Sequence, residues 1–155
     1  MSTSVTIRRP EGAVRGSIAP PPSKSVANRA LVLASLAGNL HNVHGFGTAD
    51  DVRLLHQFLV ERPHSMYCGD GGTTFRFLLA WACVQEGEEH LVTGSGRLLQ
   101  RPHAPLVGAL RSLGADITAT AAGLLVRGRK MEGGRIALHS PESSQFISAL
   151  LLVAP

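Results

Sequence analysis

Two segments of this chain are apolar on nearly every side, and they restrict its fold more than any other feature. Residues 77–84 read FLLAWACV, and residues 30–37 read ALVLASLA. A surface helix carries apolar residues along one stripe only, whereas a helix that is apolar all round is buried on most sides. The two segments therefore predict a fold with its helices inside and its sheets outside.

Helical and strand patterns alternate along the chain. Apolar spacing and the start and stop residues predict helices at residues 24–37, 48–61, 74–86, 103–114 and 143–154. Strands are predicted at residues 5–9, 40–45, 65–70, 88–94 and 134–139, with a hairpin at 115–128 and a loop at 95–102. This order predicts an α/β fold of repeated βαβαββ units, with residues 1–19 as an N-terminal strand and linker and residues 20–155 as a domain.

Charge and composition narrow the classes of partner. The net charge is +4 and the isoelectric point is about 9.8, which favours an anionic partner. The arginines stand singly, and aromatic residues make up 5% of the chain, so small anions fit better than nucleic acid. The sequence contains no apolar run near the roughly 20 residues that cross a bilayer, and no hydrophobic signal segment. We therefore expect a cytoplasmic protein without a membrane partner.

The cysteines and histidines show no spacing typical of a metal site. Cys68 and Cys83 lack a CxxC arrangement and are expected to be buried thiols. His41 and His44 are three residues apart, but no further ligand cluster accompanies them. We therefore expect no metal.

The residues at the helix starts are the strongest functional signal. The helix at 48–61 begins with its expected cap, Thr48, and with Asp50 and Asp51, which the helix dipole favours. The other starts carry cations or polar groups, namely Lys24 and Arg29, Arg76, Arg101, and the run Ser143, Ser144 and Gln145. Such cations are unfavourable unless an anion lies between them and the free backbone N–H groups, so these starts predict anion binding. The alternative is that they are ordinary solvated charges.

The first helix allows a more specific prediction. Ser25 and Arg29 are four residues apart and share a face. Lys24 points about 100° away from Ser25 and could reach a second group. Ser23 is the expected N-cap of this helix.

A glycine-rich turn precedes the helix at 74–86. It reads Gly69-Asp70-Gly71-Gly72, and it either permits positive φ angles or lets the backbone approach an anion closely. The sequence has no GxxxxGK[ST] loop and no complete GxGxxG fingerprint, so nucleotide binding is not predicted.

Five motifs in order resemble those of the 5-enolpyruvylshikimate-3-phosphate synthase (3-phosphoshikimate 1-carboxyvinyltransferase) family. They are PPSKSVANRALVLASLA, TADDVR, GDGGTTFRFLLA, GRLLQRPHAPLVGALRSLGADI and SPESSQFISALLL. The resemblance implies transfer of the enolpyruvyl group of phosphoenolpyruvate to the 5-hydroxyl of shikimate 3-phosphate, with release of phosphate. It implies no cofactor, and a fold of two similar domains that close over the substrates.

The resemblance also implies a role for individual residues. Lys24, the candidate catalytic residue, would contact both substrates. Shikimate 3-phosphate would bind to Lys24, Ser25, Arg29, Ser143, Ser144 and Gln145. Phosphoenolpyruvate would bind to Lys24, Gly72, Arg101 and Gln145. Arg76 matches a family arginine and is a further candidate.

The chain departs from the family pattern at two positions and in length. Asp70 stands where the family usually has asparagine, and Phe77 stands where it usually has proline, which leaves sensitivity to the inhibitor glyphosate open. The chain would cover an incomplete first substrate-binding domain, with residues 1–19 packing against the other domain. We therefore expect the chain to need the other, C-terminal domain of the family, or a second chain that supplies this domain. We expect the chain to be inactive alone.

Two alternatives remain at this point. One is the sister enzyme that transfers enolpyruvyl to UDP-N-acetylglucosamine. That family usually has Lys-Asn where this chain has Lys24-Ser25, and a cysteine in a mobile loop, whereas the loop GSGRLLQ has none. The other is a non-catalytic module that binds anions or nucleic acid, which the high isoelectric point would suit.

Overall fold

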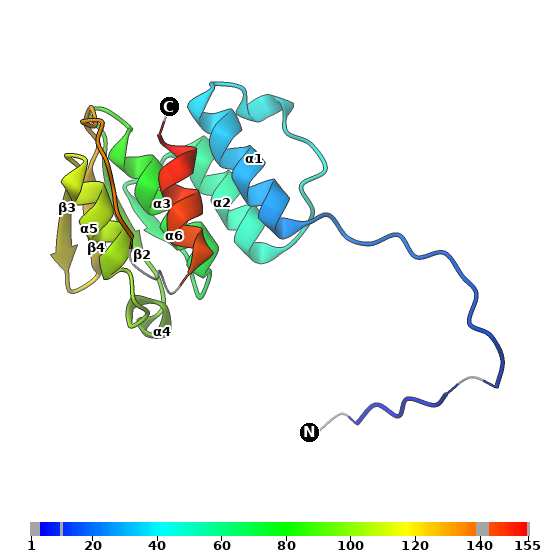
Figure 1. Ribbon diagram of the computed structural model, residues 1–155. Coiled ribbons are helices and arrows are strands. Elements are labelled where there is room, and N and C mark those ends of the chain that lie inside the picture. The colour runs from blue at the N-terminus through cyan, green and yellow to red at the C-terminus, as the bar shows by residue number, and fades with distance from the viewer. Residues whose placement is uncertain (1–3, 10, 139–142, 155) are drawn as a thin grey trace.

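The computed structural model describes residues 4–9, 11–138 and 143–154 (Figure 1). The helices are α1 (Lys24–Leu36), α2 (Asp50–Glu61), α3 (Gly72–Cys83), α4 (Gly96–Leu99), α5 (Ala104–Ser112) and α6 (Ser144–Leu152), with a 3-10 helix η1 (Leu40–Asn42). The strands are β1 (Ser65–Tyr67), β2 (Glu89–Thr93), β3 (Asp116–Thr120) and β4 (Gly123–Arg127). None of the described helices is both long and apolar enough to cross a membrane.

The four strands form one sheet in the order β1-β2-β4-β3. Strand β1 pairs with β2 in parallel, whereas β4 runs antiparallel to both β2 and β3. Two parallel strands must be joined by a crossover connection, and α3 forms the crossover between β1 and β2. The predicted hairpin consists of β3 and β4, and it joins the sheet where β4 pairs with β2. Together with α5, these elements make a βαβαββ unit, as the sequence predicts. The part of the chain that the structure describes contains one complete unit of this kind.

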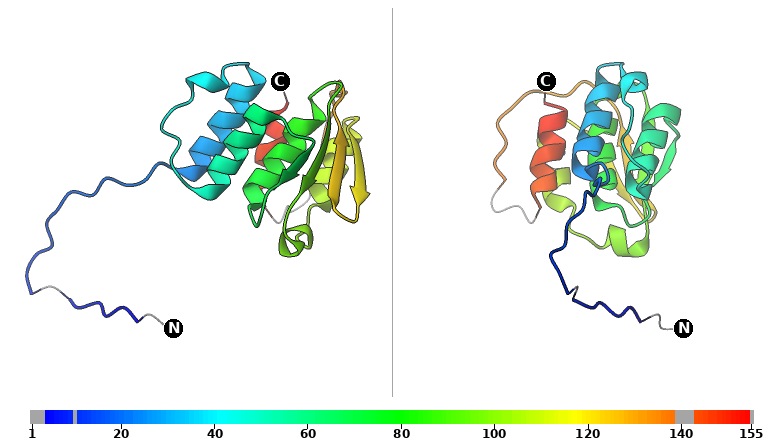
Figure 2. Two further views of the ribbon diagram at one scale, coloured as in Figure 1. Left: turned by 180° about the vertical axis from the view of Figure 1, so that it is seen from behind. Right: turned by 90° about the vertical axis from the view of Figure 1, so that its right-hand side faces the viewer.

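Helix α3 lies at the centre of the fold, between the sheet on one side and helices α1, α2 and α6 on the other (Figure 2). Every residue of α3 except Thr73 is buried, so the prediction from residues 77–84 is confirmed. Trp81 is fully buried, and its indole nitrogen donates a hydrogen bond to the Ser35 hydroxyl of α1 over 3.1 Å. This bond fixes α1 against the central helix.

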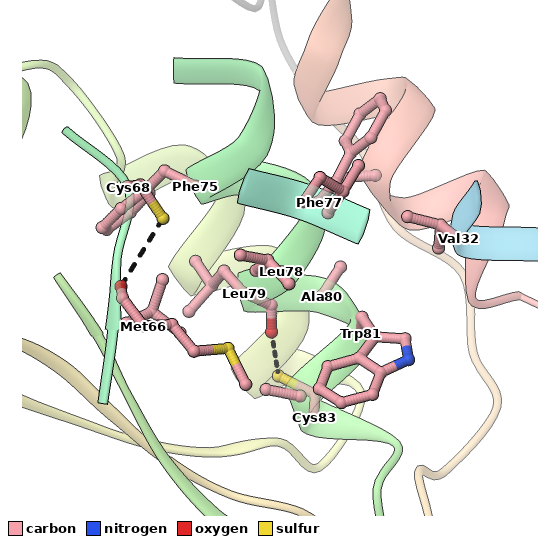
Figure 3. Close-up of a cluster of buried hydrophobic side chains, with 14 of the residues drawn as sticks. Val32, Met66, Cys68, Phe75, Phe77, Leu78, Leu79, Ala80, Trp81 and Cys83 are labelled. Atoms are coloured by element: carbon pink, nitrogen blue, oxygen red, sulfur yellow. Dashed lines mark hydrogen bonds between the residues drawn. The ribbon is translucent and has the colours of Figure 1, made fainter. Parts of the chain in front are cut away.

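The two cysteines are free, buried thiols, as predicted. Cys83 lies in α3 and donates from its thiol to the Leu79 carbonyl at 3.1 Å (Figure 3). Cys68 donates to the Met66 carbonyl in the same apolar cluster (Figure 3). Burial raises the pKa of both thiols to about 12, so neither is a thiolate near neutral pH.

Helix α1 does not meet the expectation for residues 30–37. It buries Ala27, Asn28, Leu31 and Val32 along one face only. Leu33 and Leu36 remain 49% and 38% exposed. The prediction of burial on most sides was wrong here, because the described neighbours of α1, namely η1, α2, α3 and α6, leave these leucines exposed.

Three predicted strands are absent from the described residues. Residues 5–9 are exposed and extended but have no strand beside them, and residues 40–45 contain the 3-10 helix η1 instead. Residues 134–138 form no strand, and position 139 lies outside the described residues. Strand propensity alone was a poor guide, because a strand exists only where a partner accepts its hydrogen bonds.

Two local expectations were also wrong. The predicted loop at 95–102 contains the short helix α4, whose N-cap Ser95 accepts a hydrogen bond from the Leu98 amide at 3.1 Å. Helix α2 begins after Ala49, not Thr48, and its N-cap makes no side-chain hydrogen bond. By contrast Ser23 caps α1 as predicted, accepting a hydrogen bond from the Val26 amide.

A charged network joins the residue that follows α2, Arg62, to Glu88 and His90 at the start of β2. Arg62 donates to the Glu88 carboxylate at 2.5 Å, and its guanidinium lies 4.9 Å from the Trp81 ring centroid. The ring of His90, which is buried, contacts the same carboxylate at 2.9 Å and the Pro63 carbonyl at 2.9 Å. The hydrogen bond from Arg62 is the largest influence that holds the pKa of Glu88 below its ordinary value of 4.5.

Low pH should weaken this network, because protonation of Glu88 removes its negative charge. Because the pKa of Glu88 is lower in the folded chain, its contribution to stability is present above about pH 4.5 and is lost as the pH falls through the folded value. We expect the free energy of unfolding to drop less between pH 7 and pH 3 in Glu88→Gln than in the unchanged chain. Urea unfolding at each pH measures this, and parallel curves for the two proteins would contradict it.

The packing of α3 gives a second prediction. Leu79 is fully buried, whereas Leu151 on α6 is 66% exposed. Leu79→Ala should lower the free energy of unfolding by about 2–5 kcal/mol, because it leaves a cavity in a close-packed core. The matched control Leu151→Ala should change it by less than about 0.5 kcal/mol. Equal losses in urea unfolding would show that α3 is not the centre of the core.

Candidate anion-binding site

The starts of several helices meet at one end of the molecule. In Figure 1, α1 and α6 both begin at the lower end, where α4 also lies. The Thr74 hydroxyl, in the first turn of α3, donates to the Asp51 carbonyl at the start of α2 over 2.9 Å. Because the free N–H groups of a helix lie in its first turn, this end gathers partial positive charge.

The start of α3 is shaped by two glycines. Its N-cap is Gly71, which provides no side-chain hydrogen bond to the first turn. The next residue, Gly72, is buried, and a Cβ atom built on it would lie 2.9 Å from Nη1 of Arg101 and 3.4 Å from Nη1 of Arg76. Both guanidinium groups therefore lie close to the Gly72 backbone, and a side chain at this position would displace the guanidinium of Arg101.

Arg76 is a buried cation, only 8% exposed. Its Nη1 donates to the Gln145 side-chain carbonyl of α6 over 2.5 Å, and its guanidinium lies 4.8 Å from the centroid of the Phe146 ring. Its Nε is buried without a hydrogen-bond partner among the described residues. Arg76 therefore links α3 to α6, and its Nε–H group has no acceptor among the described residues.

The two arginines lack a negative partner within the described part of the chain. No described carboxylate lies within 4.0 Å of the side chain of Arg76 or Arg101. Burial, and after it the positive charge of Arg101, lowers the pKa of Arg76. Two adjacent cations that are partly removed from water are unfavourable alone, so the site favours a bound anion.

His103 also belongs to the site, although its position in the sequence did not predict this. The ring is buried and tilted against Phe75, with centroids 4.4 Å apart. Its Nε2 donates to the Leu98 carbonyl at 2.9 Å, since a carbonyl can only accept. Burial is the largest cause that lowers the pKa of His103, and the charges of Arg76 and Arg101 act in the same direction. A neutral His103 therefore supports the turn that carries Arg101.

Lys24 has a negatively charged partner that is distant in the sequence. Its Nζ lies 3.2 Å from Oδ2 of Asp51, at the start of α2. The lysine side chain is 59% exposed, so this ion pair contributes little to stability and can open. The acidic start of α2 therefore serves as a counter-charge for the basic start of α1.

Arg29 connects α1 to α6. Its Nη1 donates to the Ser25 carbonyl at 2.8 Å, which confirms that the two residues share a face of α1. Its Nη2 donates to the Ser148 hydroxyl at 2.8 Å, and the guanidinium lies 5.5 Å from the Phe77 ring centroid. Ser148 lies within the motif SPESSQFISALLL but was given no role there; it lies one turn after Gln145 on α6 and so faces the same region.

The remaining candidates lie at the start of α6. The Ser143 hydroxyl caps this helix and accepts a hydrogen bond from the Gln145 amide at 3.2 Å. It keeps its own hydroxyl proton free to donate. Ser144 is exposed. These two hydroxyls and the first-turn amides of α6 form a second group of donors, beside Arg29.

Asp70 does not oppose the two arginines by an ion pair within the described chain. Its carboxylate accepts a hydrogen bond from the Ser95 hydroxyl at 2.5 Å. Ser95 is also the N-cap of α4, and its amide donates to the Gly69 carbonyl at 2.9 Å. Asp70 therefore ties the glycine turn to the segment that leads to Arg101.

The chain is similar to known proteins over most of its length. The family model described as EPSP synthase (3-phosphoshikimate 1-carboxyvinyltransferase) matches residues 8–61 and 55–155. A 3-phosphoshikimate 1-carboxyvinyltransferase of Photobacterium damsela subsp. piscicida is 35% identical over 182 aligned positions, which cover 98% of this chain and 42% of that protein. One from Bacteroides fragilis (strain YCH46) is 36% identical over 146 positions, which cover 92% and 35%.

Solved structures give the same fold. An EPSP synthase from Acinetobacter baumannii superimposes with a TM-score of 0.72 at 21% identity, covering 89% of this chain and 37% of that chain. A mixed α/β arrangement is thus shared with these structures. The chain spans about two fifths of the length of the curated relatives that it matches.

Space at Gly72 gives a prediction with a matched control. Gly72→Ala should weaken binding of inorganic phosphate at least about tenfold, because its Cβ would meet the Arg101 guanidinium. Gly96→Ala, in the nearby helix α4, has no atom within 4 Å of the added Cβ and should bind as the unchanged chain does. Isothermal titration calorimetry measures both, and similar affinities for the two variants would rule out an anion at Gly72.

Proposed function

Because this chain belongs to the EPSP synthase family, we propose that it supplies part of the substrate site of a 3-phosphoshikimate 1-carboxyvinyltransferase. That enzyme transfers the enolpyruvyl group of phosphoenolpyruvate to the 5-hydroxyl of shikimate 3-phosphate and releases phosphate. The family match supports this activity over a UDP-sugar enolpyruvyl transferase and over a nucleic-acid-binding module.

One observation carries the proposal. Arg76 and Arg101 flank Gly72 at the open start of α3, with no carboxylate of the described residues to neutralise them. Phosphoenolpyruvate carries a phosphate and a carboxylate, so it suits a site of two guanidinium groups and free backbone amides. We assign Gly72, Arg101 and Gln145 to this substrate, together with Lys24.

Shikimate 3-phosphate takes the neighbouring group of donors. Ser143 and Ser144, at the start of α6, hold its phosphate, and Ser25 and Arg29 bind from α1. Gln145 lies between the two groups, since its side chain contacts Arg76 and its backbone amide contacts Ser143. Lys24 reaches both substrates after leaving Asp51, which its exposure allows.

The chemistry expected of this chain is electrostatic. Both substrates are anions that repel one another, and their reacting atoms must meet. Fixed cations and helix N-termini offset this repulsion and orient the two molecules before reaction. The same groups stabilise charge on the tetrahedral intermediate of the addition–elimination. Lys24, between the substrates, is the proposed catalytic residue because its charge serves both.

We also propose that the whole enzyme has two domains, of which this chain supplies part of the first. Residues 20–155 form an incomplete first substrate-binding domain, and residues 1–19 pack with the second domain, in the cytoplasm. A C-terminal domain, or a chain that supplies it, completes the site. The 155-residue chain therefore binds its substrates weakly and does not turn them over.

Binding of shikimate 3-phosphate tests the proposal directly. Arg29→Ala should weaken it about tenfold or more, because a hydrogen bond to a charged group contributes about 1.5–3 kcal/mol. Arg127→Ala on β4 removes the same charge at the sheet, where Arg127 pairs with Glu89, and should have little effect. Calorimetric titration of both variants measures this. Equal affinities would contradict the assignment of Arg29.

A further inference from the structure

Resting on the proposed function, we propose that Arg76 is a positioning residue that holds the side-chain amide of Gln145 in one orientation. In that orientation the amide presents its NH2 group, and not its carbonyl, to the anion beside Gly72. Arg76 acts on the ligand through Gln145 as well as through its own charge.

The contact between the two side chains fixes the direction of the amide. Nη1 of Arg76 lies 2.5 Å from Oε1 of Gln145. A guanidinium group has only donors, so the amide oxygen must face it. The NH2 group lies on the other branch of the planar amide and therefore points away from Arg76. Two N–H donors are thus left for another acceptor.

The same guanidinium nitrogen places the amide at the proposed anion position. Nη1 of Arg76 also lies 3.4 Å from the Cβ position of Gly72, where Nη1 of Arg101 comes to 2.9 Å. Gln145 is therefore one hydrogen bond away from the surface that both arginines border. An anion there would meet the arginines from α3 and the α4–α5 segment, and the amide from α6.

Arg76 is itself held firmly enough to orient a neighbour. It is 8% exposed, and its guanidinium lies over the fully buried ring of Phe146. The backbone of Gln145 is held too, because its amide donates to the Ser143 hydroxyl. With the backbone and the amide oxygen both fixed, little rotational freedom remains in the Gln145 side chain.

Removal of Arg76 would free the amide to rotate by half a turn. The carbonyl would then face the anion in part of the molecules, which replaces attraction by repulsion. Loss of the charge of Arg76 would also weaken binding, so a single substitution does not separate the two effects. A double-mutant cycle with Gln145 does.

The first experiment measures inorganic phosphate binding by calorimetry in the unchanged chain, Arg76→Met, Gln145→Met and the double variant. We expect each single variant to bind about tenfold more weakly or worse. The double variant should lose less than the product of the two single losses, because Gln145 contributes fully only when Arg76 orients it. Independent, multiplicative losses would overturn the proposal.

Gln145→Glu gives a second test that does not depend on removing the buried arginine. A glutamate keeps an acceptor for Arg76 and adds an opposite charge, but it has no N–H donor to offer an anion. We expect phosphate binding to be abolished while the thermal unfolding midpoint does not fall. Binding equal to that of the unchanged chain would overturn the proposal, even if Arg76→Met fails to fold.

The side-chain amide can also be observed directly. Its NH2 signals in a 15N–1H spectrum are identified by their loss in Gln145→Met. Phosphate should shift these signals in the unchanged chain and leave them nearly unmoved in Arg76→Lys, which keeps the positive charge but not the planar fork. A purely structural role of Arg76 would not couple phosphate to this amide, so unmoved signals in the unchanged chain would overturn the proposal.

Arg101→Ala separates this inference from the proposed function. If the unchanged chain does not bind phosphate, the anion site and the role of Arg76 fall together. If the unchanged chain binds phosphate, Arg101→Ala abolishes binding and Arg76→Met retains it, the site stands and the role of Arg76 alone is overturned.

Discussion

The burial of α3 is the constraint on which the rest of the structure depends. A helix covered by a sheet on one side and by three helices on the other can place polar groups only near its ends. The polar end of α3 is its start, where Gly72 and Arg76 lie one turn apart. Because Arg76 is buried there, its charge cannot be fully solvated, and the structure surrounds it with Phe146 and Gln145 from α6. The core and the candidate site are therefore parts of one arrangement.

The gathering of helix starts follows from the same packing. Helices α1, α2 and α6 cover α3, and their first turns lie near its first turn. Each start adds partial positive charge, and side chains from one helix balance or extend the next. Lys24 is paired with Asp51, whereas Arg76 and Arg101 have no such partner among the described residues. The difference distinguishes cations that the fold neutralises from those that a ligand would have to neutralise.

Patterns local in sequence were reliable where local physics decides them. Helix α3 and the hairpin of β3 and β4 were predicted from apolar spacing and turn residues, and Ser23 from the capping preference of serine. Residues 134–138 failed as a strand because a strand requires a neighbour that no local pattern supplies. Residues 5–9 have no such neighbour among the described residues, and their expected partner is the other domain. Residues 30–37 are not buried on most sides for a related reason, since an apolar surface shows only that burial would be favourable.

The same distinction between local pattern and tertiary contact applies to the candidate site. The sequence by itself determined that cations stand at helix starts, that the chain carries the motifs of the EPSP synthase family, and that Gly72 leaves its position without a side chain. Only the tertiary structure decided that Arg76 faces Gln145, that His103 supports the turn before α5, and that Lys24 pairs with Asp51. The reason is physical: helix propensity, capping and dipole effects act within a few residues, whereas these contacts join side chains from elements that meet only when the core is packed.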